Sequence, residues 1–140
     1  MKTIRNEEIK KKLREIDDSL PIIEENMPSD AEEFEKMGLI KDGIYKKIEF
    51  AIENVIDILN IINSDLSLGV PSDEDSIIKN LEKKRIISKK LTDKIIEMKG
   101  FRNILVHRYG DINDKQAFET IKENLDDFGF FKKEILKILK

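Results

Sequence analysis

Apolar residues recur along this chain at spacings of three and four positions, which is the period of an amphipathic α-helix. The first such stretch covers residues 9–23 and contains Pro21, where we expect a kink or a break because proline removes a helical hydrogen bond. A stop and a restart are expected at 27–30, with Ser29 as the N-cap and Glu32 completing a capping-box pattern. The pattern predicts no strand, since apolar and polar residues do not alternate.

The longest apolar pattern covers residues 40–59 and predicts a helix with one wide apolar face. Glu49, Glu53 and Asp57 form an acidic row on another face of the same helix. Such a row resembles half of a carboxylate-bridged di-metal site, but the Glu-x-x-His pairs that these bundles need are absent. We therefore interpret the row as a solvated or cleft-lining face.

Cap signals divide the second half of the chain into three more helices. After a loop at 64–72 that contains Gly and Pro, Ser72 is the expected cap of a short helix, and Ser88 is the expected cap of the next. The final helix is expected to begin near Asn113. We predict an all-α fold, an antiparallel bundle of four to five helices that forms a single domain over residues 1–140.

Composition narrows the possible chemistry. The chain has no cysteine and one histidine, which excludes disulfides, thiolate zinc sites and zinc sites built on paired histidines within one chain. Its 26 basic and 29 acidic residues give a net charge of -3, so any RNA or nucleotide site must be local. No apolar run reaches the roughly 18 residues of a membrane span, and the N-terminus has no signal-peptide core. We expect a cytoplasmic protein with no membrane association.

The only histidine, His107, lies five positions after Arg102 and two before Tyr109. On a straight helix Asn103 and His107 share a face, but Arg102 and His107 lie about 140° apart. The groups converge only if the helix ends near His107, if the arginine side chain swings round, or if a second subunit supplies the opposite wall. Gly110, expected as the C′ residue of this helix, makes the first option possible.

These residue types suit RNA cleavage by internal phosphoryl transfer. His107 can take the proton of a ribose 2′-hydroxyl, and Arg102 can hold the scissile phosphate and stabilise its charge. Asn103 can orient the imidazole, and Tyr109 can donate a hydrogen bond or stack on a base. Such a reaction requires no metal ion and no other cofactor.

A purely structural interpretation competes with this one. His107 and Arg108 in the last turn of a helix complement its dipole, at about 0.3–1 kcal/mol each. Arg102 can pair with an acidic neighbour, and Tyr109 can close the core. Residue types and spacing alone favour this structural interpretation.

The segment 98–109 resembles the signature of the HepT-like branch of the HEPN domain family: a Gly-Phe pair, then arginine, four residues, histidine, one residue and tyrosine. The likeness extends to 45–57, which is similar to the long second helix of the family, and to 121–128, which is similar to its closing helix. Val70-Pro71 resembles the loop before the short helix. One departure is Lys46, where relatives carry an arginine near the glutamate of the second helix.

This resemblance implies a helical bundle that forms a homodimer, with the motif in a cleft at the interface. It implies a metal-independent RNA endonuclease acting as the toxin of a type VII-like toxin–antitoxin pair, with Arg102 and His107 as catalytic residues. The partner would be a MntA-type nucleotidyltransferase antitoxin that transfers AMP to Tyr109. Phosphodiester-linked AMP brings bulk and negative charge into an RNA-phosphate site, which explains the neutralisation.

Two other functions remain open from the sequence. Some HEPN domains resemble the catalytic ones but hold a nucleotide or a nucleotidyltransferase without cleaving RNA, and the net charge of -3 gives RNA little long-range attraction. A structural four-helix protein is the other alternative. In that case His107→Ala and Tyr109→Phe would change only stability, by about 1 kcal/mol.

Overall fold

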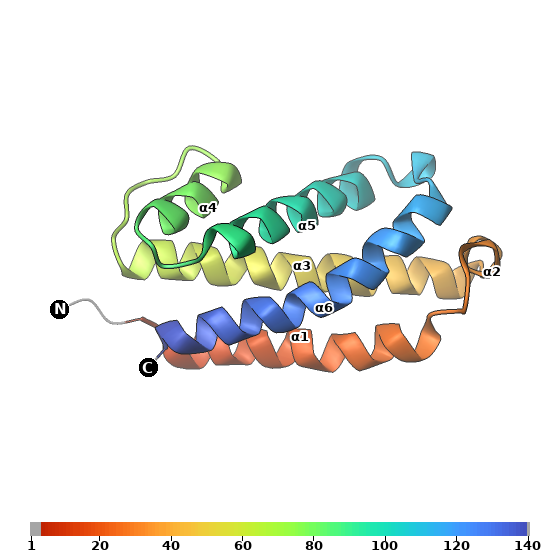
Figure 1. Cartoon of the computed structure of the whole chain (residues 1–140), viewed down its shortest axis with the longest axis horizontal. Coiled ribbons are helices and arrows are strands. Elements are labelled where there is room, and N and C mark those ends of the chain that lie inside the picture. Colours follow the sequence, from red (N-terminus) through yellow and green to blue (C-terminus); the bar gives the residue numbers. More distant parts are fainter. Residues whose placement is uncertain (1–3, 140) are drawn as a thin grey trace.

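The computed structural model describes residues 4–139 and is entirely helical over that range, as predicted (Figure 1). It contains six α-helices and one short 3-10 helix, where four to five helices were expected. The additional element is a five-residue helix, which follows the predicted stop and ends before Gly38 at φ +60. The elements are α1 (Asn6–Asn26), α2 (Ala31–Glu35), α3 (Leu39–Asp65), α4 (Glu74–Lys83), α5 (Lys89–His107), η1 (Tyr109–Asp111) and α6 (Asp114–Ile138).

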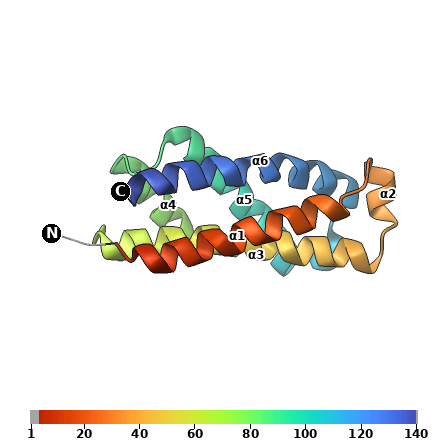
Figure 2. The same cartoon turned by 90° about the horizontal axis from the view of Figure 1, so that it is seen from below.

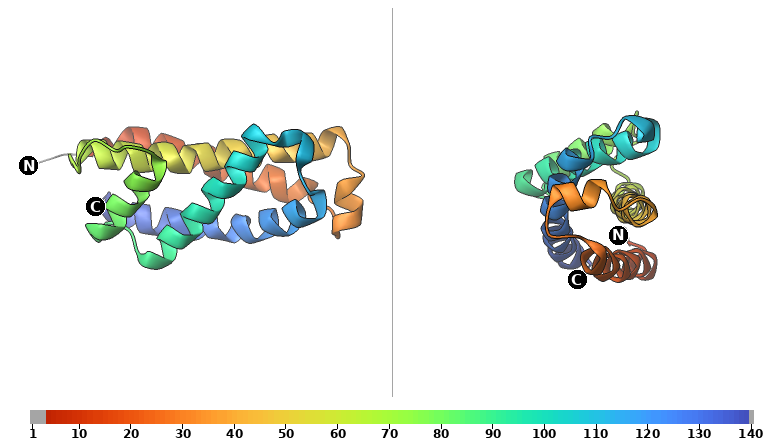
Figure 3. Two further views of the ribbon diagram at one scale, coloured as in Figure 1. Left: turned by 90° about the horizontal axis from the view of Figure 1, so that it is seen from above. Right: turned by 90° about the vertical axis from the view of Figure 1, so that its right-hand side faces the viewer.

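Four long helices form the bundle, and neighbours in it run in opposite directions. Helix α1 lies against α3 and α6, and α5 packs on α3 and α6 from the other side (Figures 1 and 2). Helix α4 covers the end of the bundle at which α5 begins, and α2 lies at the opposite end, near the start of α6 (Figure 3). The end of α5 and η1 are therefore brought beside the first turns of α3. None of the helices within 4–139 is long and apolar enough to cross a membrane.

The predicted apolar stripes form the core. On α1 the residues at three- and four-residue spacing are buried, and those of α3, α5 and α6 meet them in one cluster. Pro21, however, does not break α1, which continues to Asn26. Pro21 is exposed, so water can pair with the carbonyl that loses its helical N–H partner.

Two helix caps were predicted one position before the residue that forms the cap in the structure. Asp30, not Ser29, caps α2, and Asp73, not Ser72, caps α4. In both cases a carboxylate accepts the backbone N–H three residues later at 2.8 Å, which a charged oxygen does at least as well as a hydroxyl. A serine followed by an aspartate therefore offers two adjacent caps, and local pattern alone does not select between them.

The caps of the two helices that flank the motif are confirmed. Ser88 caps α5 by accepting the Leu91 N–H at 3.0 Å, and Asn113 caps α6 by accepting the Gln116 N–H at 3.1 Å. These caps leave residues 108–113 as the only connection between α5 and α6. The predicted site residues thus lie on the last turns of α5 and in this short connection.

Candidate active site

Arg102 is buried on the face of α5 that meets α3 and α4, with only 9% of its surface exposed. Its Nη1 donates to Glu53 Oε1 on α3 at 2.5 Å, and its Nη2 donates to Glu74 in the first turn of α4. Its Nε is buried without a hydrogen-bond partner. One guanidinium therefore joins three helices.

The charge of Arg102 is secured by these two carboxylates. Burial alone would lower the Arg102 pKa, but the hydrogen bonds and charges of Glu53 and Glu74 outweigh burial and raise it. The guanidinium stays protonated, and its positive charge is already matched by two negative ones. Any phosphate that reaches Arg102 must compete with these carboxylates.

These partners of Arg102 were not predicted from the sequence. Glu53 was placed in an acidic row interpreted as solvated or cleft-lining, and Glu74 was not singled out. The pairs join residues 49 and 28 positions apart, which helical periodicity cannot register. The one available signal was that a buried arginine needs acidic partners, which the structural interpretation of Arg102 included.

His107 is the last residue of α5 and is exposed to solvent. Within the described residues no hydrogen bond or ion pair links it to another side chain, so the structure does not join it to Arg102. Asn103 is partly buried and forms no hydrogen bond with His107, so its predicted role in orienting the imidazole stays a prediction. The imidazole is accessible to a ligand or to a second chain.

The helix end near His107 was predicted correctly, but the role of Gly110 was wrong. The C-cap is Arg108, whose N–H donates to Ile104 O at 2.9 Å, and Gly110 lies inside η1 without a positive φ. The N–H of Asp111 then donates to Arg108 O at 2.9 Å. A 3-10 turn thus satisfies the carbonyl groups that a left-handed glycine was expected to satisfy.

Tyr109 begins η1, and its hydroxyl donates a hydrogen bond to Asp42 in the first turn of α3. Its ring packs edge-on against that of Tyr45, with ring centroids 5.9 Å apart and an interplanar angle of 85°. Burial, followed by the hydrogen bond and charge of Asp42, raises the Tyr109 pKa to about 12. With 45% of its surface exposed, Tyr109 does not close the core.

Tyr45, the residue against which the Tyr109 ring packs, is itself fixed by polar contacts. It is 2% exposed, and its hydroxyl donates to Asp114 Oδ1 at 2.6 Å, while Lys41 binds the other oxygen of that carboxylate at 2.8 Å. Burial and the bond to Asp114 raise the Tyr45 pKa well above its usual range. The ring of Tyr109 therefore packs against Tyr45 of α3, which is bound to Asp114 of α6.

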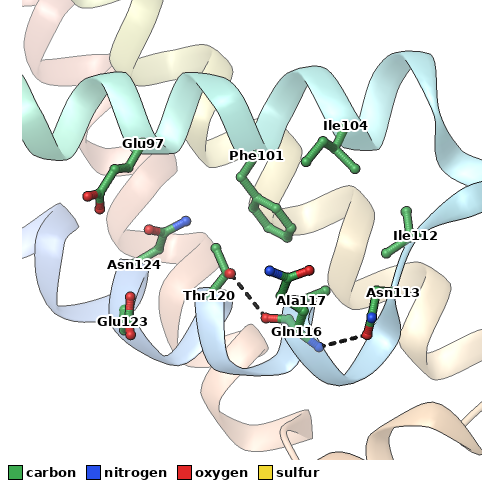
Figure 4. Close-up of a pocket in the computed structure, with 10 residues that line it drawn as sticks. All are labelled: Glu97, Phe101, Ile104, Ile112, Asn113, Gln116, Ala117, Thr120, Glu123 and Asn124. Carbon is green, nitrogen blue, oxygen red and sulfur yellow. Dashed lines mark hydrogen bonds between the residues drawn. The ribbon is translucent and has the colours of Figure 1, made fainter.

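A pocket of about 380 Å³ lies between α5 and α6, but it does not include the predicted site residues (Figure 4). Phe101 and Ile104 line it from α5, and Gln116, Thr120 and Asn124 line it from α6. The Nδ2 atom of Asn124 has no hydrogen-bond partner, but it is buried and so does not reach the open space of the pocket. The pocket lies on a different face of α5 from the Arg102 contacts.

No group of three or more His, Cys, Asp or Glu side chains among residues 4–139 is placed to hold a metal ion. Glu49, Glu53 and Asp57 instead pair separately: Glu49 with Lys46 at 3.1 Å, Glu53 with Arg102, and Asp57 with Lys12 at 3.4 Å. The acidic row is thus divided among three cations.

The helical bundle, with an Arg-x4-His-x-Tyr motif at the end of a helix, defines a HEPN-like protein. The chain belongs to the ribonuclease HepT-like family, which it matches over residues 9–135. The resemblance inferred from the motif is thereby confirmed. Lys46, the noted departure, is an exposed residue paired with Glu49 and does not contact Arg102.

Two relatives carry nuclease names. The mRNA nuclease HepT of Shewanella oneidensis is 29% identical over 102 residues, which are 73% of this chain and 77% of that protein. A putative RNase of Archaeoglobus fulgidus is 28% identical over 81 residues, which are 58% of this chain and 61% of that protein.

Solved structures with the same fold include toxin–antitoxin complexes. A mutant MntA–HepT complex contains a chain with a TM-score of 0.81 and 27% identity, covering 92% of this chain and 97% of that one. The tri-AMPylated HEPN toxin of Shewanella oneidensis, in complex with the MNT antitoxin, has a TM-score of 0.83 and 27% identity, covering 92% and 96%. YutE of Bacillus subtilis, with a TM-score of 0.84 and 19% identity over 99% and 93% of the chains, shares the fold.

Proposed function

We propose that this chain is a metal-independent RNA endonuclease that acts in the cytoplasm as the toxin of a HepT/MntA-type pair. The observation that carries the proposal is the exposed His107 at the end of α5, with Arg102 and Tyr109 at family spacing in a HepT-like chain. The nuclease name of the Shewanella oneidensis relative supports the reaction type. The complex of a similar toxin with MNT antitoxin supports the partner.

In the proposed reaction His107 takes the proton of a ribose 2′-hydroxyl, and the oxygen attacks the neighbouring phosphorus. The bond from phosphorus to the 5′-oxygen of the next nucleotide breaks; this oxygen leaves with the electron pair and takes a proton from water, and a cyclic phosphate remains on the other fragment. Arg102 binds the phosphate and stabilises the charge that develops on its oxygens. Histidine suits the first step because its ordinary pKa of about 6.5 allows proton uptake near neutral pH.

The contacts of Arg102 set a condition on this reaction. Its guanidinium is bound to Glu53 and Glu74, so an RNA phosphate has to replace at least one carboxylate. Glu74 is the more readily replaced partner, because it lies in the first turn of a ten-residue helix that follows a loop. Glu53 instead lies in the middle of the 27-residue helix α3.

We propose that the active unit is a homodimer. In a single chain Arg102 points toward α3 and α4, while His107 lies exposed at the end of α5. A second copy that packs beside the exposed end of α5 would form a cleft. Residues of both chains would then contact one RNA strand in that cleft. Sedimentation equilibrium tests this directly: the expected mass is twice 16.4 kDa, and a monomer at micromolar concentration would contradict it.

Control by AMP transfer is the second part of the proposal. Tyr109 is 45% exposed, and it lies two residues after His107. An AMP group on this oxygen adds negative charge and bulk where an RNA phosphate would bind, which blocks cleavage. Intact mass after co-expression with the product of a neighbouring nucleotidyltransferase gene is the test: AMP additions are expected in the parent chain and absent in Tyr109→Phe.

RNA cleavage is tested with purified protein in EDTA. Cleavage is expected in the parent, and its loss is expected in His107→Ala and in Arg102→Lys, which keeps a positive charge but not the two-pronged geometry. Lys115→Ala, which removes an exposed cation on α6, is the control variant that should cleave normally. Retained cleavage in His107→Ala would overturn the mechanism.

The double pairing of Arg102 favours one alternative function. A guanidinium that is already bound to two carboxylates binds an RNA phosphate weakly. This is expected of a HEPN module that only holds a nucleotide or a nucleotidyltransferase. Calorimetry with ATP and with RNA separates the two functions. Binding of ATP by a chain that neither binds nor cleaves RNA would favour the non-catalytic module.

A further inference from the structure

The hydroxyl of Tyr109 has a resident acceptor, because it donates to a carboxylate oxygen of Asp42. The two residues lie 67 positions apart and are brought together where η1 meets the first turn of α3. Both residues are exposed at the surface of the described chain. The contact therefore does not serve to satisfy a polar group buried in the core.

The ring of Tyr109 packs against a buried neighbour beside this contact. It rests edge-on against Tyr45, which is itself bound to Asp114. The fold thus contains two tyrosine–aspartate pairs side by side, and they differ in access. Tyr45 is 2% exposed and Tyr109 is 45% exposed, so only the pair of Tyr109 and Asp42 can meet a nucleotide.

Tyr109 is a poor nucleophile without help. Its pKa is raised to about 12, so at pH 7 about one molecule in 10⁵ carries the phenolate. An attack on phosphorus at a useful rate requires a group that takes the proton as the new bond forms. Asp42 is the only residue among those described whose side chain accepts the hydrogen bond of this hydroxyl.

We propose that Asp42 is the catalytic base that takes the proton of Tyr109 when this tyrosine is adenylylated. The inference rests on the proposed function, in which a nucleotidyltransferase presents ATP to the hydroxyl. Tyr109 Oη bonds to the α-phosphorus, and the bond from that phosphorus to the oxygen bridging to the β-phosphate breaks. Pyrophosphate leaves with the electron pair, and the proton moves to the Asp42 carboxylate. The modified chain therefore supplies one of its own catalytic groups.

The charges around the site define what the partner must supply. Asp42, Asp114 and Glu49 all act on Tyr109 electrostatically, and Lys41 is occupied by Asp114. A triphosphate beside these carboxylates is repelled unless cationic groups accompany it. The transferase that presents ATP to Tyr109 must therefore carry the cations that bind the phosphates.

The test follows AMP addition to the parent chain and to Asp42→Asn by intact mass, with the partner nucleotidyltransferase and ATP. Asparagine keeps the shape and an acceptor oxygen but does not take the proton, so modification is expected to slow about 100-fold, within the usual range for general base catalysis. Asp42→Glu is expected to recover part of the rate. Asp93→Asn, which removes the same charge from an exposed ion pair with Lys89 near the start of α5, is expected to stay within about threefold of the parent.

If Asp42 acted only through its charge, the rate of AMP addition to Asp42→Asn would rise instead of fall. Removing the Asp42 charge lowers the Tyr109 pKa and increases the phenolate fraction, so Asp42→Asn would then be modified faster. A rate equal to or above that of the parent overturns the role of Asp42 alone, provided that parent and variant melt at the same temperature. A parent chain that gains no AMP overturns the proposed control by AMP transfer together with this inference.

Discussion

Glu53 in the middle of α3 accepts a hydrogen bond from the guanidinium of Arg102 on α5 at 2.5 Å. The pair joins two long helices through the residue that carries the first position of the motif. Because Arg102 is nearly enclosed, loss of this partner leaves part of a buried charge without its hydrogen bond.

The substitution Glu53→Gln is therefore expected to destabilise the fold. Its cost is expected to be about 1–3 kcal/mol, the range for leaving a buried polar group unsatisfied, and less if Glu74 takes over both contacts. Urea unfolding followed by circular dichroism measures the difference. Glu49→Gln is the control one turn earlier, since its partner Lys46 is 77% exposed and such pairs contribute less than about 1 kcal/mol. Equal stability of the two variants would contradict the structural role of Glu53.

Replacement of Glu74 is expected to act on RNA binding more than on the fold. Glu74→Gln removes a charge that competes with phosphate for the guanidinium of Arg102. We expect RNA to bind about tenfold more tightly, the equivalent of about 1.4 kcal/mol. Asp75→Asn removes the same charge from the same helical turn, but its partner is Lys99 at 2.7 Å. If both variants bind RNA equally well, the gain comes from net charge and not from release of Arg102.

The hydroxyl of Tyr109 is expected to titrate late. Its folded pKa of about 12 lies above the unfolded value of about 10, so the folded chain holds this proton more tightly. The stabilising contribution of Tyr109 is fully present below pH 10 and is lost as pH rises through about 12. Difference absorbance of the phenolate measures the midpoint, and only Tyr45 and Tyr109 contribute. A step near 10 while circular dichroism still reports the native fold would contradict this prediction.

Asp42→Asn provides a second check on the same titration. Removing this carboxylate is expected to move the Tyr109 midpoint downward, since its hydrogen bond and charge both raise the pKa. The midpoint should remain above the ordinary value, because burial and the charges of Asp114 and Glu49 persist. An unchanged midpoint would mean that the hydroxyl is not bound to Asp42 in solution.

Substitution of Gly110 tests how α5 ends, and Gly38, which lies before α3 with a positive φ, is the comparison. Gly110 has no positive φ, and a Cβ there meets nothing within 4 Å, so Gly110→Ala is expected to be neutral or stabilising by about 0.4–1 kcal/mol. Gly38 lies at φ +60, so Gly38→Ala is expected to destabilise by about 1–2 kcal/mol, although a Cβ there also has space. Thermal melts compare the two. A destabilised Gly110→Ala would restore the left-handed helix end that the sequence suggested.

The sequence predicted the helices well because apolar spacing is a local property that directly determines which face is buried. It placed α1, α3, α5 and α6 and found the caps Ser88 and Asn113. It failed where two local solutions compete, as at the Ser-Asp pairs before α2 and α4, and at Pro21, where exposure lets the helix continue.

The chemistry of the site was predicted from residue types, but its contacts were not. Arg102, His107 and Tyr109 were identified from the motif, whereas Glu53, Glu74 and Asp42 were not recognised as their partners. Each of these contacts joins residues at least 28 positions apart. Pairings at such distances depend on how helices cross, which a single sequence does not encode locally.

Arg102 connects three helices, whereas His107 contacts no other side chain through a hydrogen bond or ion pair within residues 4–139. A descendant of this chain that no longer cleaved RNA would still need the arginine to keep its helices together. Mutation of the histidine would break no hydrogen bond or ion pair between side chains among residues 4–139, and would cost at most the small helix-dipole contribution. Loss of the histidine with retention of the arginine is therefore the expected evolutionary mark of a HepT-like chain that has given up nuclease activity.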